Sequence, residues 1–233
     1  MATMNNNHRS PKFILDEKKV LIIGLGGLGS PVAMYLAAAG VGHLVLADFD
    51  RVDLSNLQRQ IVHDTTQIGQ YKTISAQTKL QALNPDIEIS FIKDMISEDF
   101  LIEDDIDVVV DCSDNFATRF IINAACVHAG TPLVSGAALR WGGQVAVFSS
   151  SPQSPCYRCL YSDNEDEGEA CSDAGILAPL VGVIGSIQAV EVIKVLCGIG
   201  NPLSGRLLLF DALSMQWRTL KLHKDPTCPI CSN

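Results

Sequence analysis

The chain has 233 residues, 47% of them hydrophobic, and a formal net charge of −9. This length and composition suffice for the buried core of one large domain or two small ones. The negative charge argues against nucleic acid and against an anionic membrane surface as partners, since both would be repelled.

The first 19 residues are polar and lack the apolar segment of a secretory signal. The long uncharged stretch 174–190 contains Pro179 and two glycines. It is shorter than the roughly 20 residues that a membrane span needs, so we expect a buried helix there. We therefore expect a cytoplasmic protein whose eight cysteines are thiols or metal ligands and not disulfides.

Strand and helix patterns alternate along the first two thirds of the chain, and uniformly apolar strands in such a pattern are typical of a parallel sheet covered on both faces. The predicted strands are 20–23, 43–47, 87–92, 106–110 and 132–134, and the predicted helices are 27–39, 70–83 and 115–129, with a polar helical turn at 53–60.

The pattern changes after residue 140. Hydrophobic and polar residues alternate at 144–148, 205–211 and 216–222, which predicts antiparallel strands added at one end of the sheet. An acidic loop at 163–169 and the apolar helix lie between them. Without repeats or a long linker, we expect one mixed α/β domain over residues 20–233, after the polar segment 1–19.

The sequence GLGGLGS, residues 24–30, follows the first predicted strand and opens the first helix. Gly24, Gly26 and Gly29 satisfy the pattern G-x-G-x-x-G, and Asp48 ends the next strand, where a carboxylate can bind a ribose hydroxyl. A helix N-terminus also offers free N–H groups to phosphate. These features predict a nucleotide site without saying which nucleotide binds.

The glycine loop itself favours ATP over a nicotinamide dinucleotide. Gly27 is a further position without a side chain and Ser30 adds a hydroxyl, so the loop offers more open backbone than a dinucleotide requires. On this interpretation, Gly27→Val should block ATP while leaving the fold largely intact.

The polar turn at residues 50–60 supports the same choice. It brings Asn56, Arg59 and Gln60 close to the end of the second strand, and Lys72 opens the next helix. Arg59 and Lys72 are suited to neutralise a triphosphate. The alternative is that both are ordinary solvated surface charges.

The third buried strand ends in the sequence DCSDN, residues 111–115. Asp111 and Asp114 therefore lie at the carboxyl edge of a parallel sheet, where ligands bind in such folds. One of them could hold a Mg²⁺ ion that bridges phosphates. Asp114 could equally cap the helix that begins near Asn115.

Two C-x-x-C pairs, Cys156 with Cys159 and Cys228 with Cys231, predict a closed, structural Cys₄ zinc site. A redox role for the pairs is the alternative. Three other cysteines are expected to be core thiols: Cys112, Cys126 and Cys197. His43 and His63 are expected to have structural roles.

Cys171 differs because it follows the acidic loop on a segment that should be exposed. An exposed thiol is a candidate nucleophile. Its neighbours Glu169 and Asp173 should raise its pKa and so reduce the thiolate fraction. From the residues alone, an incidental surface cysteine is as good an interpretation.

The motifs GLGGLG, SNLQRQ, DCSDN, CYRCL and CPIC, with Lys72, resemble those of the ThiF/MoeB/HesA family of ubiquitin-activating-enzyme-like adenylyltransferases. The resemblance runs from about residue 20 to residue 231. The long acidic insert before Cys171 is more similar to the ThiF branch than to the MoeB branch.

The resemblance implies a Rossmann-like, mostly parallel sheet with a Cys₄ zinc site. It also implies that the enzyme binds ATP and Mg²⁺ and adenylates the C-terminal glycine of a small ubiquitin-fold sulfur carrier ending in Gly-Gly, releasing pyrophosphate. For a ThiF-like member the carrier is ThiS, in thiamine thiazole biosynthesis, and the alternative is MoaD, in molybdopterin biosynthesis. A sulfurtransferase and a second copy of the chain are the other implied partners.

The resemblance also assigns roles to residues. Arg59, Lys72, Asp114 (with Mg²⁺) and Cys171 are the implied catalytic residues, and relatives also use an N-terminal arginine, for which Arg9 is the candidate here. The implied nucleotide-binding residues are Gly24, Gly26, Gly27, Gly29, Asp48, Ser55, Asn56, Leu57, Gln58, Arg59, Lys72, Asp114 and Asn115, and the implied zinc ligands are Cys156, Cys159, Cys228 and Cys231.

Two other functions stay open at this point. A nicotinamide-dependent oxidoreductase would explain the glycine loop and Asp48 but would give no role to Arg59, Lys72 or the cysteine pairs. A non-catalytic member that only docks a ubiquitin-fold partner would give no role to the two cations.

Overall fold

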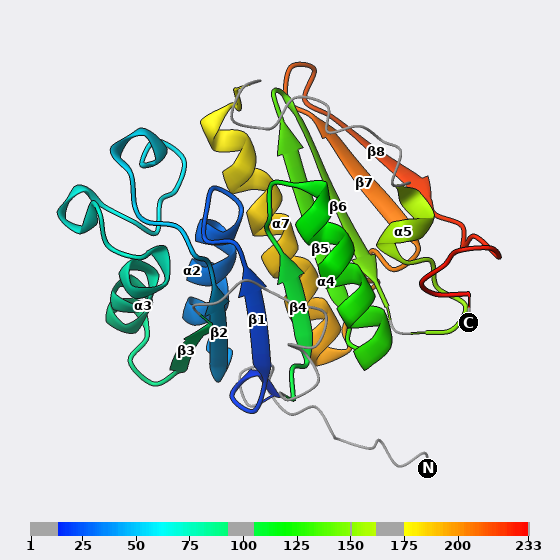
Figure 1. Cartoon of the computed structure of the whole chain (residues 1–233), viewed down its shortest axis with the longest axis horizontal. Coiled ribbons are helices and arrows are strands. Elements are labelled where there is room, and N and C mark those ends of the chain that lie inside the picture. Colours follow the sequence, from blue (N-terminus) through cyan, green and yellow to red (C-terminus); the bar gives the residue numbers. More distant parts are fainter. Residues whose placement is uncertain (1–13, 93–104, 150, 162–174, 233) are drawn as a thin grey trace, which may run out of the picture.

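A computed structural model of the chain describes residues 14–92, 105–149, 151–161 and 175–232. Its centre is an eight-stranded sheet in the order β3-β2-β1-β4-β5-β6-β7-β8 (Figure 1). The first five strands in the chain are parallel, and the last three extend the sheet in antiparallel fashion. The strands are β1 (Lys19–Ile23), β2 (His43–Ala47), β3 (Glu88–Ile92), β4 (Val108–Asp111), β5 (Leu133–Leu139), β6 (Gly142–Phe148), β7 (Arg206–Asp211) and β8 (Gln216–Lys221).

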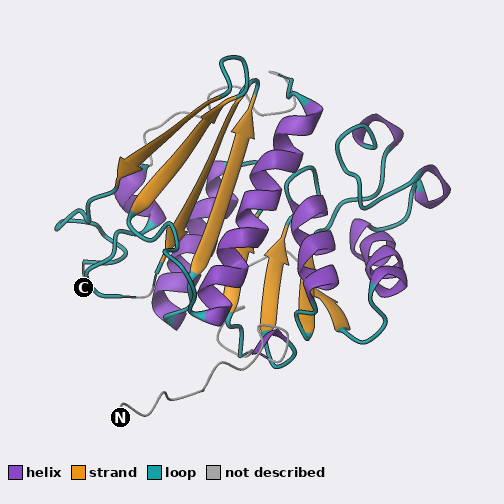
Figure 2. Cartoon of the chain, turned by 180° about the vertical axis from the view of Figure 1, so that it is seen from behind, coloured by secondary structure: helices purple, strands orange, loops and turns teal. Residues whose placement is uncertain are grey.

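Helices cover both faces of the sheet. The long helix α7 (Ala178–Cys197) and α2 (Gly29–Ala39) lie side by side on one face, which is turned to the viewer in Figure 2. The helices α4 (Phe116–Ala129) and α5 (Tyr157–Leu160) cover the other face. Helix α3 (Lys72–Leu83) packs beside α2 at the β3 edge. Two short 3₁₀ turns, Leu54–Asn56 and Thr65–Gln67, belong to the excursion between β2 and α3.

The apolar strands supply two hydrophobic cores, one on each face. In β1, Val20 and Ile22 belong to the core beneath α2 and α7, and Leu21 and Ile23 belong to the core beneath α4. Successive side chains of a strand point to opposite faces, so a strand buried on both sides must be apolar throughout. The predicted mixed α/β architecture with an antiparallel extension is confirmed.

Helix α7 corresponds to the predicted buried helix, but it runs from Ala178 to Cys197 instead of over 174–190. It is long and apolar enough to cross a membrane by length and composition alone. Its small residues allow close packing in this fold, since a Cβ on Gly185 would lie 2.4 Å from the Leu28 carbonyl oxygen of α2's N-terminal turn. The helix also contacts β4, β5 and β6, which explains its apolar composition.

The predicted strand at 132–134 is too short. β5 continues to Leu139 because β6 turns back and pairs with it over its whole length, from Leu133 opposite Phe148 to Leu139 opposite Gly142. This pairing extends the sheet beyond the parallel part and forms one wall of the site described next.

Candidate functional site

A cavity of about 890 Å³ lies at the carboxyl ends of β1, β2, β4 and β5. One end of it, which we call the nucleotide end, is lined by the glycine loop and by Asp48, Arg59, Lys72 and Asp114. The other end, which we call the far arm, runs over β6, β7 and the start of β8. Ligands of doubly wound sheets bind outside the carboxyl ends of the strands, where this cavity lies.

Close backbone contacts explain two of the loop glycines. Gly24 has φ +89°, and a Cβ there would lie 2.7 Å from the Cys112 carbonyl oxygen. A Cβ on Gly29 would lie 1.9 Å from the Gly24 carbonyl oxygen. Gly26 is different, because a Cβ there would meet only the Gln60 amide nitrogen, at 3.6 Å, and Gly26 lines the cavity. Gly26 is therefore the loop position with room beside its backbone.

Gly27 corrects an expectation from the sequence. It lines the cavity, but a Cβ there would lie 2.7 Å from Val181 Cγ2 on α7. The missing side chain makes room for α7 as well as for a ligand. The expectation that Gly27→Val leaves the fold largely intact is therefore wrong, because valine would push against a buried helix.

The Asp48 carboxylate joins two parts of the nucleotide end. Its Oδ2 accepts a hydrogen bond from the Leu25 N–H (2.7 Å) and its Oδ1 accepts one from the Asp50 N–H (2.8 Å). Asp48 thereby fixes the glycine loop against the turn after β2, at the cavity wall where the sequence predicts a ribose contact.

Lys72 is not a solvated surface charge, since its side chain is only 6% exposed. Its Nζ lies 2.8 Å from Asp50 Oδ2 and 3.9 Å from Asp48 Oδ2. Arg59 is half-buried, and its Nη2 donates to Asn56 Oδ1 at 2.7 Å. Both predicted cations therefore line the cavity with defined partners.

Most other residues of the SNLQRQ segment do not line the cavity. The Ser55 N–H and hydroxyl both donate to Asp53 Oδ1, which caps the 3₁₀ turn. Five predicted nucleotide-binding residues do not line the cavity, and their contacts with nucleotide stay predictions: Gly29, Ser55, Asn56, Leu57 and Gln58.

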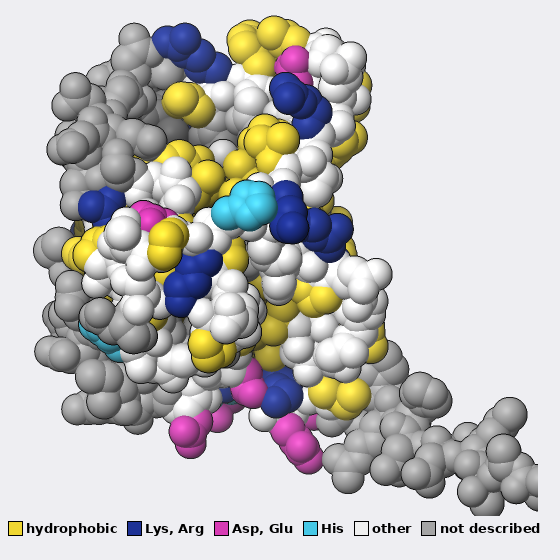
Figure 3. Space-filling model, turned by 90° about the vertical axis from the view of Figure 1, so that its right-hand side faces the viewer, with side chains coloured by type: hydrophobic (Ala, Val, Ile, Leu, Met, Phe, Trp, Pro, Cys, Tyr) yellow, Lys and Arg dark blue, Asp and Glu magenta, His cyan; other side chains and the backbone are white. Residues whose placement is uncertain are grey.

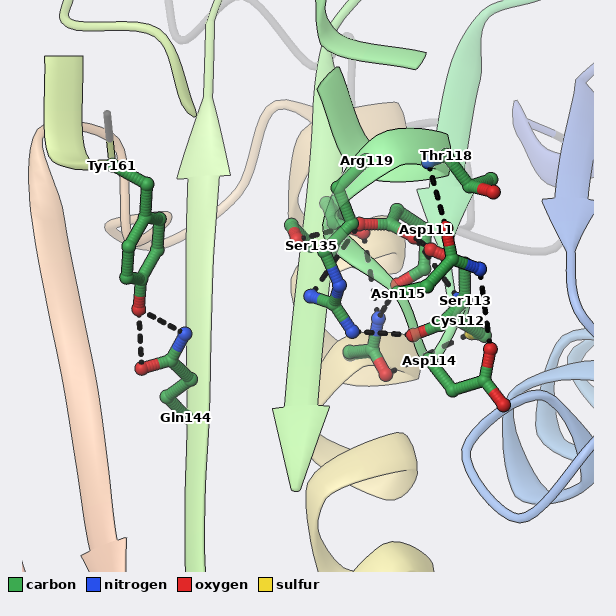
Figure 4. Close-up of polar contacts among 12 residues, drawn as sticks. Asp111, Cys112, Ser113, Asp114, Asn115, Thr118, Arg119, Ser135, Gln144 and Tyr161 are labelled. Carbon is green, nitrogen blue, oxygen red and sulfur yellow. Dashed lines mark hydrogen bonds and ion pairs between the residues drawn. The ribbon is translucent and has the colours of Figure 1, made fainter. Parts of the chain in front are cut away.

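A buried polar network holds the end of β4 (Figure 4). Asp111 is 1% exposed, and it accepts hydrogen bonds from the Ser113 N–H (3.0 Å), the Ser113 hydroxyl (2.6 Å) and the Ser135 hydroxyl (2.8 Å). Arg119 of α4 lies with its Nη1 3.7 Å from Asp111 Oδ2, and its Nη2 donates to the Ser113 carbonyl. Asp111 is thus an anchor for the loop and not a ligand-facing carboxylate.

The next carboxylate, Asp114, is exposed and lines the cavity. It accepts a hydrogen bond from Asn115 Nδ2 at 3.3 Å (Figure 4). The cap of α4 is Asn115, whose side chain accepts from the Thr118 N–H, so the alternative that Asp114 caps this helix is wrong. The Asp114 side chain is left to face the cavity.

The sequence motifs do not reveal the far arm. Gln144 of β6 and Tyr161, just after α5, face each other there and form hydrogen bonds of 2.6 and 3.0 Å (Figure 4). Leu209 and Arg218 of the neighbouring strands complete this wall. The alternation of QVAVF places Gln144 on one face of its strand, but no sequence signal pairs it with Tyr161.

The four cysteines of the C-x-x-C pairs converge at one point. All four sulfur atoms lie within 4.8 Å of one another, with Cys156–Cys228 at 3.7 Å and Cys159–Cys231 at 3.5 Å. Tetrahedral zinc with bonds of ~2.3 Å places its sulfurs about 3.8 Å apart, so the residues fit the ion. Asn123 Nδ2 and the Asp225 N–H donate to two of the sulfurs, as outer hydrogen bonds of such sites do. This convergence favours the predicted zinc site over two separate redox pairs.

The other described cysteines are poor nucleophiles. Burial raises the pKa of Cys112 and of Cys126, which keeps both as thiols, although Cys112 lines the cavity. Cys197 is half-buried near the end of α7, so it is less enclosed than the predicted core thiol. Cys171 and Arg9 lie outside the described residues.

Known proteins resemble this chain over most of its length. The ThiF family model matches residues 13–230. The sulfur carrier protein ThiS adenylyltransferase of Escherichia coli is 50% identical over 218 residues, 92% of this chain and 86% of the relative. The molybdopterin-synthase adenylyltransferase of the same organism is 47% identical over 219 residues, 93% of this chain and 88% of the relative.

A third relative and a solved structure support the same family and fold. The sulfur carrier protein adenylyltransferase of Thermus thermophilus is 43% identical over 227 residues, 94% of this chain and 84% of the relative. Among solved structures, E. coli MccB with ATP shares the fold, with a TM-score of 0.84 over 95% of this chain and 68% of that chain at 24% identity. The family match and the curated relatives show that the chain belongs to the ThiF family and is an adenylyltransferase.

Proposed function

We propose that the enzyme transfers AMP from ATP to the C-terminal carboxylate of a ubiquitin-fold sulfur carrier protein and releases pyrophosphate. One observation carries this proposal: a single cavity joins the glycine loop, Arg59, Lys72 and Asp114 at one end to the far arm at the other. ATP would occupy the nucleotide end, and the extended Gly-Gly terminus of the carrier would enter through the far arm.

The chemistry needs little more than alignment and counter-charge. A terminal carboxylate is already ionised at pH 7, so its attack on the α-phosphorus requires no general base. The enzyme has to hold the two reactants in line and to neutralise the charge that develops on pyrophosphate. Arg59 would supply positive charge at the nucleotide end, and Lys72, which lies 2.8 Å from Asp50 Oδ2 in the structure, would supply it by turning to a phosphate oxygen.

Asp114 is the proposed Mg²⁺ ligand. It is an exposed carboxylate on the cavity wall, and Mg²⁺ in nucleotide sites is held by one or two carboxylates, phosphates and waters. When bound, the ion would neutralise phosphate oxygens. The four converging cysteines would hold zinc in a closed structural site, because no position is left for water.

The carrier that we propose is ThiS, and MoaD is a second candidate that the relatives support equally. The two Escherichia coli relatives, 50% and 47% identical, are named for different pathways. ATP–pyrophosphate exchange with each purified carrier tests the proposal. Exchange that depends on ThiS is expected. Exchange with MoaD alone would reassign the pathway, and exchange with neither would refute the proposal.

The far arm opens toward β8, whose six side chains are all exposed. In Figure 3, both Lys or Arg side chains and hydrophobic side chains are exposed on the side of the molecule that carries this strand. Arg218 and Lys221 are among the exposed basic residues, and Trp217 and Leu220 are among the exposed hydrophobic ones. Arg218 and Leu220 lie on one face of β8 and Trp217 and Lys221 on the other, so each face of this edge strand would offer a basic and a hydrophobic side chain to the body of the carrier protein.

Three further roles belong to the proposal. Cys171 would bond through sulfur to the C-terminus of the adenylated carrier, with AMP as the leaving group. A sulfurtransferase would supply the sulfur, and Arg9 would reach the ATP site of a second subunit. A Cys171→Ser variant should lose thiocarboxylate formation, and Arg9→Ala should slow pyrophosphate exchange. Unchanged rates would refute the respective role.

We also propose a cytoplasmic homodimer. Tyr35 of α2 and Val183 and Val190 of α7 are large hydrophobic side chains exposed on one face, and Figure 2 shows no described layer over these helices. A second copy of the chain would cover such a face. Sedimentation equilibrium that gives the monomer mass at micromolar concentration would refute the dimer.

A further inference from the structure

The glycine loop is held from behind by a buried histidine. His63 is 6% exposed, and its Nε2 lies 3.0 Å from the carbonyl oxygen of Leu25, between Gly24 and Gly26. A carbonyl oxygen can only accept, so Nε2 carries the proton and donates it. Neither His63 nor Leu25 lines the cavity, whereas Gly24 and Gly26 do. The bond is therefore made on the side of the loop away from the ligand space.

The other side of the imidazole is also fixed. Nδ1 lies 2.7 Å from the Ser75 hydroxyl oxygen on α3, the helix that begins with Lys72, and this hydroxyl donates to Gln67 Oε1 at 2.6 Å. Burial lowers the pKa of His63, the hydrogen bond to the Leu25 carbonyl opposes this shift, and the charge of Lys72 adds to it. The ring thus ties the glycine loop to α3.

The hydrogen bond from His63 to the Leu25 carbonyl also fixes the direction of the Gly26 N–H. In a planar trans peptide the C=O and the following N–H point in opposite directions. When His63 holds the Leu25 carbonyl, the Gly26 N–H is turned away from His63. Among the described residues, no protein group accepts a hydrogen bond from that N–H. Asp48 fixes the preceding peptide through the Leu25 N–H, so both peptides around Leu25 are held.

We propose that His63 is a positioning residue for nucleotide binding: its Nε2–H bond to Leu25 aims the Gly26 N–H into the cavity, toward a phosphate of the nucleotide. The inference rests on the proposed function, since it takes ATP as the ligand. It goes beyond it by giving a role to a buried side chain that touches no substrate. A histidine that served only the packing of the core would not affect phosphate recognition.

Three substitutions separate these two roles. Glutamine places its amide nitrogen where His63 has Nε2, so His63→Gln keeps a donor for Leu25. Asparagine places its amide where His63 has Nδ1, so His63→Asn keeps the Ser75 contact and loses the Leu25 bond. His63→Leu removes both bonds.

The experiment measures dissociation constants for Mg-ATP and for adenosine by calorimetry, without carrier protein. Zinc content and melting temperature of each variant report on folding. We expect His63→Asn and His63→Leu to weaken ATP binding about tenfold, the equivalent of one hydrogen bond, and His63→Gln to stay within about threefold of the unsubstituted chain. Adenosine should bind equally to all, because it lacks phosphate.

Three results would overturn the inference. The first is a folded His63→Asn variant that binds ATP as tightly as the unsubstituted chain. The second is a loss of ATP affinity in His63→Gln as large as in His63→Asn, and the third is an equal loss of affinity for adenosine and for ATP. If the unsubstituted chain binds no ATP, the proposed function fails, and the inference fails with it. If the unsubstituted chain binds ATP, the proposed function survives any outcome for the variants.

Discussion

Removing the Arg119 guanidinium should destabilise the enzyme more than a typical substitution does. Arg119→Met leaves the Asp111 carboxylate buried without its counter-charge, and breaking a buried ion pair in this way costs about 3–5 kcal/mol. Asp111 keeps three hydrogen bonds, two from Ser113 and one from Ser135. We therefore expect a loss at the lower end, about 3 kcal/mol of the free energy of unfolding.

Urea denaturation with zinc at a fixed concentration measures the loss. The matched control is the double variant Asp111→Asn with Arg119→Met, in which no buried charge is left unpaired. We expect it to recover at least half of the lost stability, since a neutral replacement of a buried pair is often tolerated. A single variant within about 1 kcal/mol of the unsubstituted chain would refute the reasoning, and so would a double variant no more stable than the single one.

The same substitution has a functional consequence. Arg119 also holds the Ser113 carbonyl, which directly precedes the proposed magnesium ligand Asp114. A looser loop should raise the Mg²⁺ concentration needed for half-maximal pyrophosphate exchange. An unchanged Mg²⁺ dependence in the folded variant would show that Arg119 serves stability alone.

Lys72→Met should slow pyrophosphate exchange at least 100-fold, as the loss of one stabilising group in an active site does, whereas Lys79→Met on the exposed face of the same helix should not; equal effects would contradict the role of Lys72. Cys228→Ser should abolish zinc retention, measured by atomic absorption, and lower the melting temperature, whereas the control Cys126→Ser should keep its zinc. Zinc retention by Cys228→Ser would argue against the Cys₄ site. Gly27→Ala should cost about 1–3 kcal/mol through its contact with Val181, and adding Val181→Ala should restore most of it; a failure to restore stability would show that the contact is not the cause.

The sequence predicts the elements of the fold well because each has a local signal. The apolar runs of β1 and β2 and the glycine loop between them need no distant partner to be identified. The length of β5 is different, because its last residues are strand only through pairing with β6. The site divides in the same way: Lys72 and Asp114 lie in motifs, whereas Gln144 and Tyr161 meet only in the folded sheet. Gly27 shows a third case, in which the motif is right but the packing reason comes from Val181, far along the chain.

The residues that face the ligand space depend on buried polar groups behind them. Gly26 lies opposite the bond between His63 and Leu25, and Asp114 follows a loop held by Asp111 and Arg119. A buried polar group must be hydrogen-bonded, so each of these anchors has its partners dictated by the fold. An exposed loop residue is free to move unless such an anchor fixes its backbone. The proposed site therefore depends on residues of the core. Substitutions at His63 should alter nucleotide binding, and substitutions at Arg119 should alter metal binding, although neither side chain contacts the ligand.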